Sequence, residues 1–190
     1  RQQIDWLRAL ALTFIRQGKP DDKTAAALGK KIAPFYPSVS DALDRELVQL
    51  LVYLNEPSVI DKTIALLHKK HEQSFVVSDE LLKRHGGYGG SIRRMLDNQP
   101  QLQNLHFAFV LRNLRYGWTL EQRKAYYDFL DTQAKASGGN SYGKFLKNIR
   151  AEAMANTPEQ AQIALNLKKG DLAALPTELP KPEGPGIRSR

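Results

Sequence analysis

The stretch SDALDRELVQLLVYLNEPSVIDKTIALL, residues 40–67, decides the fold of this chain. One apolar stripe at the spacing of an α-helix face is formed by Leu43, Leu47, Leu50, Leu51 and Leu54. A second stripe follows at Ile60, Ile64 and Leu67. Between them lies Asn55-Glu56-Pro57, and proline is favoured in the first turn of a helix. The stretch therefore predicts two antiparallel helices joined by a tight corner, with Asp44, Arg45, Glu46 and Gln49 facing away from the stripe.

Neither helix of this pair can bury its apolar stripe alone, so the pair needs another pair against it. The flanking segments are weaker versions of the same unit, and none shows the alternation of a β-strand. We therefore expect an all-α chain of about eight to ten helices, stacked as antiparallel pairs in an α-solenoid. The alternative is an ordinary helical hairpin within an irregular all-α domain.

The length of 190 residues suffices for one domain with a sizeable core. We expect a helical-repeat domain over residues 1–175. The following segment, PTELPKPEGPGIRSR at 176–190, is rich in proline and predicts a linker or disordered tail. No apolar run is long enough to span a membrane. The abrupt helical start, RQQIDWLRALALTFIRQG, suggests a segment cut from a longer polypeptide.

The chain carries a formal net charge of +8 and has no cysteine. Disulfides and thiol chemistry are thereby excluded, while the charge makes nucleic acid a candidate partner. However, the basic residues are spread along the chain as short pairs, such as Lys30-Lys31 and Lys168-Lys169. Such pairs are typical of solvated faces and helix C-termini. A nucleic-acid-binding helical repeat therefore stands as an alternative to a protein-binding one.

Motifs for catalysis or cofactors are weak. His68, His71 and Glu72 have a spacing that metal sites use, but they do not form an H-E-x-x-H motif. The glycine-rich GGYGG at 86–90 lacks the strand before it and the lysine after it that a phosphate loop requires. His106 lies in a predicted helix over 101–116 and is more typical of a core or boundary histidine. We expect no catalytic residue, metal or cofactor in this segment.

The most suggestive local group combines the 115–118 corner with the glycine turn at 137–141. A glycine turn exposes backbone N–H groups, and a helix N-terminus attracts an anion. The predicted anion or partner contact site comprises Arg115, Trp118, Gly138, Gly139, Asn140, Ser141 and Lys144. The alternative is that the turn merely caps the next helix and that Trp118 packs over a corner. In either case Thr119 and Gln122 have the spacing of a capping box.

Two stretches also resemble known proteins. Residues 45–67, RELVQLLVYLNEPSVIDKTIALL, resemble a HEAT-type unit. Residues 104–154, and most specifically GWTLEQRKAYYDFL and GGNSYGKFLKNIR, resemble a segment of large secreted or periplasmic proteins of planctomycete-type bacteria. Those proteins combine a β-propeller resembling sugar dehydrogenases, a HEAT-like helical region and a haem-binding cytochrome c module. The likeness spans roughly residues 10–154.

This resemblance implies a HEAT-like spacer in a periplasmic or secreted redox-type protein, with haem in a neighbouring module. The propeller and haem motifs have no counterpart in these residues, so no catalytic or haem-ligating residue is carried over. We therefore expect a non-catalytic scaffold whose partners are neighbouring domains or another protein. The alternatives are a basic nucleic-acid-binding repeat, and an enzyme with a site between helices near Trp118 and the 137–144 turn.

Overall fold

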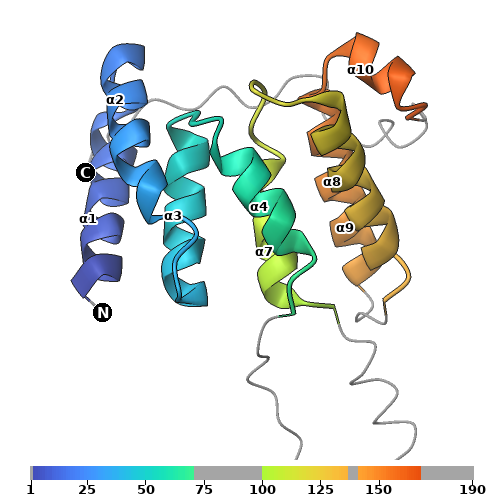
Figure 1. Cartoon of the computed structure of the whole chain (residues 1–190), viewed down its shortest axis with the longest axis horizontal. Coiled ribbons are helices and arrows are strands. Elements are labelled where there is room, and N and C mark those ends of the chain that lie inside the picture. The colour runs from blue at the N-terminus through green and yellow to red at the C-terminus, as the bar shows by residue number, and fades with distance from the viewer. Residues whose placement is uncertain (1, 71–99, 137–140, 168–190) are drawn as a thin grey trace, which may run out of the picture.

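The computed structural model describes residues 2–70, 100–136 and 141–167, and within these ranges the chain forms helices and no strand (Figure 1). The helices are α1 (Gln2–Gln17), α2 (Asp22–Ile32), the short 3-10 helix η1 (Ala33–Phe35), α3 (Asp41–Tyr53), α4 (Val59–Leu67), α7 (Leu102–Leu111), α8 (Leu120–Gln133), α9 (Tyr142–Ala155) and α10 (Glu159–Ala164). The prediction of an all-α chain is confirmed.

The helix contacts form a continuous series across the molecule. Helix α3 packs against α1 and α7, and α7 packs against α9. In front of these, α2 lies against α3, α4 lies against both α3 and α7, and α8 lies against α4 and α9 (Figure 1). Helices α1 and α2 therefore lie at one end of the molecule, and α8, α9 and α10 lie at the other (Figure 1).

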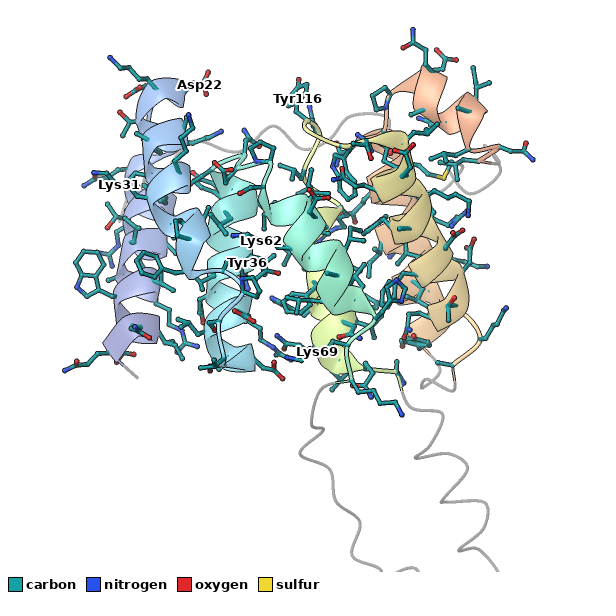
Figure 2. The ribbon with its side chains drawn as sticks, in the orientation of Figure 1. Asp22, Lys31, Tyr36, Lys62, Lys69 and Tyr116 are labelled. Atoms are coloured by element: carbon teal, nitrogen blue, oxygen red, sulfur yellow. The ribbon has the colours of Figure 1, made fainter. Side chains whose placement is uncertain are left out.

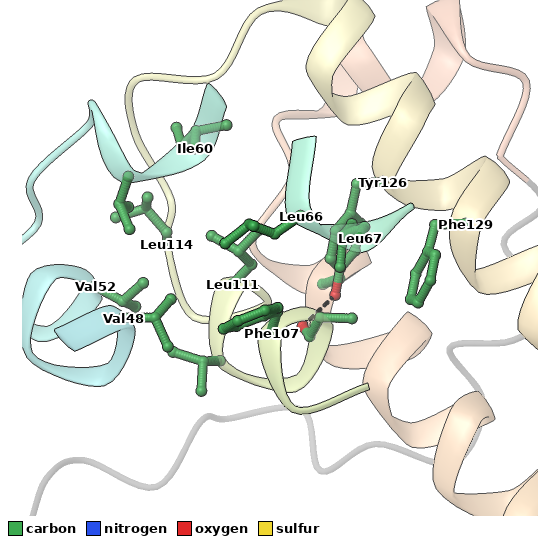
Figure 3. Packing of buried hydrophobic residues seen from close by; sticks show 14 of the residues in the cluster. Val48, Val52, Ile60, Leu66, Leu67, Phe107, Leu111, Leu114, Tyr126 and Phe129 are labelled. Carbon is green, nitrogen blue, oxygen red and sulfur yellow. Dashed lines mark hydrogen bonds between the residues drawn. The ribbon is translucent and has the colours of Figure 1, made fainter. Parts of the chain in front are cut away.

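The main core lies where α3, α4, α7 and α8 meet. Phe107 of α7 is completely buried, as are Val48 of α3 and Ile60 of α4. Figure 3 shows Phe107 and Leu111 of α7 among side chains from the neighbouring helices. Because α7 buries almost its whole circumference, it is the central helix of the described body.

Short polar side chains cap the starts of α2, α3 and α8. Asp21 accepts a hydrogen bond from the Thr24 backbone N–H at the start of α2, and Ser40 accepts one from the Leu43 N–H at the start of α3. The capping box of Thr119 and Gln122 at α8 is present in full. These side chains satisfy backbone N–H groups that have no partner within the helix, so they fix where each helix begins.

The predicted orientation of Asp44 on the outer face of α3 is wrong. Its side chain is 3% exposed, and its Oδ1 accepts a 2.6 Å hydrogen bond from the Ser38 backbone N–H. The connection that precedes α3 folds over this face of the helix and covers it. The sequence pattern of α3 identified the leucine stripe but not this second buried side, which also includes Val48 and Val52.

Two more sequence predictions differ from the structure or lie outside it. Helix α7 ends at Leu111 instead of continuing to residue 116, and residues 112–114 form hydrogen-bonded turns. The GGYGG segment and the tail at 176–190 lie outside the described residues.

Candidate functional site

The first part of the predicted site lies at the corner between α7 and α8. Arg115 is exposed, and its Nε donates a 2.9 Å hydrogen bond to Oδ1 of Asn156, just after α9. Trp118 is half-buried, and its indole N–H donates a 2.8 Å hydrogen bond to the Leu114 carbonyl. The Trp118 ring also meets the Tyr126 ring edge to face, with centroids 5.6 Å apart. Both side chains therefore hold the corner in place.

The second part of the predicted site lies at the other end of α9. Ser141 is the N-cap residue of α9, and Lys144 is exposed in the first turn. Because α9 separates Ser141 from Asn156, the Arg115 corner is about 22 Å away along the helix axis. Among its described members, Arg115 and Trp118 therefore lie near one end of α9, and Ser141 and Lys144 lie at the other. The remaining members, Gly138, Gly139 and Asn140, lie outside the described residues.

Beside Trp118 lies a buried guanidinium that the sequence did not single out. Arg123 is 7% exposed, and one terminal nitrogen donates a 2.7 Å hydrogen bond to Thr157 Oγ1. The other donates a 3.0 Å bond to the Arg115 carbonyl, and the guanidinium carbon lies 5.2 Å from the Trp118 ring centroid. Thr157 also meets the Tyr127 hydroxyl at 2.9 Å. We call the group formed by Arg123, Thr157, Tyr127 and the Arg115 carbonyl the α7–α9 junction.

The electrostatics of the junction explain how a buried cation is tolerated there. The partners of Arg123 lie just beyond the C-terminal ends of α7 and α9, where the helix dipoles are negative. Burial lowers the pKa of the Arg123 guanidinium, although an arginine remains charged in proteins. A cavity of about 10 Å³ beside it has the size of one water molecule. The junction therefore joins three helices and has no room for an organic substrate.

An apolar groove of about 370 Å³ opens at the other end of the molecule, between α1, η1 and α3. Its walls include Trp6, Leu7, Leu10, Ile32, Phe35, Leu43 and Leu47, and all of its described lining residues are uncharged. Trp6 is 76% exposed and Phe35 is 67% exposed. Large apolar side chains that remain this exposed around a concavity are typical of interaction sites. We call it the α1–α3 groove.

The η1 wall of this groove is anchored to α4. Lys62 Nζ donates hydrogen bonds of 2.6 Å to the carbonyl oxygens of Ala33 and Tyr36. The Tyr36 hydroxyl meets Thr63 Oγ1 at 2.8 Å, and Tyr36 is 1% exposed. Figure 2 shows Lys62 beside Tyr36. Because both neighbours of the Pro34-Phe35 segment are held, Phe35 is fixed at the edge of the groove.

The groove could not be predicted from the sequence, because an apolar pattern describes one helix at a time. Trp6 lies on α1, and the structure leaves its side chain uncovered. The available signal was a difference in length, since α1 has 16 residues and α2 has 11. A shorter helix cannot cover the whole apolar face of a longer one.

The histidines of the described ranges show ordinary packing. His106 is half-buried on α7, its Nε2 lies 3.3 Å from the Gln49 amide nitrogen, and burial lowers the pKa of its imidazole. His68 is exposed and meets the Phe129 ring edge to face, while His71 and Glu72 lie outside the described residues. Within the described ranges, no group of three or more metal-ligating side chains is placed to hold a metal ion.

Comparisons with known proteins identify no relative. A scan against protein-family models, a search of curated proteins and a search of solved structures each returned no match. Among the helices of the described ranges, none has the length and apolar character needed to cross a membrane.

Proposed function

We propose that this chain is a non-catalytic helical-repeat scaffold that binds other polypeptides. Among the described residues, the proposed repeat comprises four helix pairs: α1 with α2, α3 with α4, α7 with α8, and α9 with α10. In this arrangement α1, α3, α7 and α9 form one layer, and α2, α4, α8 and α10 form the other. The contacts of α3 with α1 and α7, and of α4 with α8, support the two layers, and the contact of α3 with α4 supports one of the pairs.

Similar corners join the two helices of each proposed pair. Three corners read Gly18-Lys19-Pro20, Asn55-Glu56-Pro57 and Asn156-Thr157-Pro158, and the fourth reads Gly117-Trp118-Thr119. The first residue has a positive φ at Gly18, Asn55 and Gly117, with values of 87°, 57° and 84°. Gly18 and Asn55 closely follow the ends of α1 and α3, whereas α7 already ends at Leu111, before Gly117. Thr119 and Pro158 are the N-cap residues of α8 and α10.

Successive corners also touch one another. An added Cβ on Gly29 of α2 would lie 3.1 Å from the Glu56 Cβ, so the chain of the first pair closely approaches the second corner. Pro57 in the same corner contacts Gly117 of the third corner. Arg115 then bonds to Asn156 in the fourth corner. These contacts between sequential units are what a repeat array requires.

The single observation that carries the scaffold proposal is the α1–α3 groove with its exposed Trp6 and Phe35. By contrast, the buried Asp44 and Arg123 and the half-buried Lys62 serve the fold. Asp44 accepts from a backbone N–H, and Lys62 and Arg123 donate to backbone carbonyls. Groups engaged in this way join helices to one another.

The pairing of basic side chains favours a polypeptide partner over nucleic acid. Arg8 pairs with Glu46 across α1 and α3, and Arg150 pairs with Asp131 across α9 and α8, both at 2.7 Å. Arg112 forms an ion pair with Glu152. A phosphate backbone would have to compete with these carboxylates for the guanidinium groups. As part of the same proposal, the scaffold belongs to a larger extracytoplasmic protein.

Site-specific photo-cross-linking in cells that make the protein tests the scaffold proposal. A photoreactive phenylalanine analogue would replace Tyr116 or Phe145, which are exposed and lie outside the groove lining, and a third variant would carry it at Trp6. We expect light-dependent adducts that protease removes and nuclease does not. Adducts removed by nuclease, or no adduct from any of the three positions, would contradict the proposal.

A further inference from the structure

We propose that the α1–α3 groove binds the apolar face of an amphipathic, acidic-flanked helix supplied by a partner protein. This inference rests on the scaffold function and specifies the partner for one surface. Its first support is that the groove continues an existing helix interface. Leu7, Leu10 and Ile32 line the groove and also pack on the buried cluster that α2 forms with α1 and α3.

The part of α1 that α2 leaves uncovered has room for a second helix. At 1.5 Å per residue, α1 is about 24 Å long and α2 about 16 Å, so α2 covers only part of α1. The chain then turns into η1 at Ala33, while Trp6, Leu7 and Leu10 continue the apolar face of α1. A second helix in line with α2 would contact this face in the way that α2 contacts Phe14.

The dimensions of the groove match the helix-in-groove mode of recognition. The lining residues Trp6 and Leu10 on α1, and Leu43 and Leu47 on α3, are each one helical turn apart. A volume of about 370 Å³ accommodates a few large apolar side chains. An amphipathic helix presents such anchors at positions i, i+3 or i+4, and i+7.

The positive charge beside the groove indicates that the partner helix carries negative charge beside its apolar face. Lys30 and Lys31 are exposed in the last turn of α2, immediately before the lining residue Ile32. Neither lysine forms an ion pair with another described residue. Lys31 projects from α2 in Figure 2. Because the groove lining itself is uncharged, carboxylates beside the apolar face of the partner would meet Lys31.

The test uses a fluorescent helical peptide of about 15 residues, with leucines at i, i+3, i+4 and i+7 and glutamates beside them. Fluorescence anisotropy of the labelled peptide, titrated with the full chain, gives the affinity. We expect saturable binding that Trp6→Glu weakens about tenfold or more, because a charge would then enter the apolar groove. We expect Lys31→Glu to weaken binding of the glutamate peptide and to strengthen binding of a lysine-flanked version.

Ile15→Glu is the matched control for Trp6→Glu. Ile15 is 73% exposed on the same helix, and nine residues of helix place it about 180° from Trp6. Its substitution should leave peptide affinity unchanged. Equal losses from both substitutions, or absence of saturable binding to the wild-type chain, would overturn the groove assignment. So would concentration-dependent dimerisation of the chain that Trp6→Glu abolishes, since the occupant would then be a second copy.

The two proposals fail in different ways. If the peptide does not bind while photo-cross-links form at Tyr116 or Phe145, the scaffold function stands and the groove is not its binding site. If the peptide binds in solution but no position gives a cross-link in cells, the groove is able to bind a helix but the scaffold function is contradicted.

Discussion

Gly117 contacts Pro57 so closely that an added Cβ on Gly117 would lie 2.5 Å from the Cβ of Pro57. The φ of Gly117 is also +84°, a conformation that a side chain disfavours. We therefore predict that Gly117→Ala lowers the free energy of unfolding by about 2–4 kcal/mol, from backbone strain and overpacking together. Urea unfolding followed by circular dichroism measures it.

Gly18→Ala separates the two contributions to this loss. Gly18 has a similar φ of +87°, but its added Cβ would meet no atom within 4 Å. Gly18→Ala should lower the free energy of unfolding through backbone strain alone, by about 1–2 kcal/mol. Equal losses at both positions would show that the contact between the second and third corners contributes nothing to stability.

Lys62 is predicted to stabilise the fold through the two carbonyl groups that it binds. Replacing it with methionine keeps much of the side-chain volume but leaves the Ala33 and Tyr36 carbonyls without their charged donor. We expect a loss of about 1–3 kcal/mol, measured by thermal or urea unfolding. Lys124→Met is the control, because Lys124 forms only an exposed pair with Asp128 and should cost about 0.5 kcal/mol or less.

Local signals in the sequence predicted the helices well. Each cap combines a short polar side chain with a backbone N–H two or three residues away, so Ser40 and Thr119 are readable without tertiary information. The corner at Asn55-Glu56-Pro57 is equally local, and Glu56 accepts a hydrogen bond from the Ser58 N–H. Short-range chemistry therefore helps to determine where α2, α3 and α8 start.

Features that depend on distant segments could not be read in the same way. Asp44 is a polar residue that lies away from the leucine stripe of α3. It is buried only because the segment at Ser38 folds over this side of the helix. Arg115 bonds to Asn156 just after the C-terminal end of α9, whereas Lys144 lies in the first turn of α9, so the two are far apart. The candidate groove depends on the relative lengths of α1 and α2, which no single-helix pattern contains.

Arg123 is predicted to require the geometry of arginine and not only a positive charge. Its fork reaches the Arg115 carbonyl and the Thr157 hydroxyl at once, whereas a lysine ammonium is a compact donor. Arg123→Lys and Arg123→Met should each lower the free energy of unfolding by about 1–3 kcal/mol, as measured in urea. A fully stable Arg123→Lys variant would show that charge alone suffices.

Arg8→Met is the control for the Arg123 variants. Arg8 makes an ion pair with Glu46, but its side chain is 62% exposed, so the pair should contribute about 1 kcal/mol or less. Added salt should reduce the effect of Arg8→Met and leave that of Arg123→Met nearly unchanged, because screening acts on exposed charges. The same salt response for both would contradict the buried placement of Arg123.

Asp44 is predicted to make stability depend on pH. Burial raises the pKa of its carboxyl above the usual value, outweighing the hydrogen bond from the Ser38 N–H, and nearby Asp41 adds to the rise while Lys69 opposes it. Between its unfolded and folded pKa values, the native state therefore binds more protons than the unfolded state. The contribution of Asp44 is fully present below its unfolded pKa of about 3.9 and is lost as pH rises through its folded pKa.

Asp44→Asn tests this sign, because an amide oxygen can still accept from Ser38 and carries no charge. Its stability relative to the wild type should rise between about pH 3 and pH 7, as measured by urea unfolding at several pH values. Asp44→Ala removes the acceptor as well, and leaving the Ser38 N–H unpaired should cost about 1–3 kcal/mol across the range. A relative stability of Asp44→Asn that falls with increasing pH would mean that the folded-state pKa is lowered and that the buried carboxylate is favoured in its charged form.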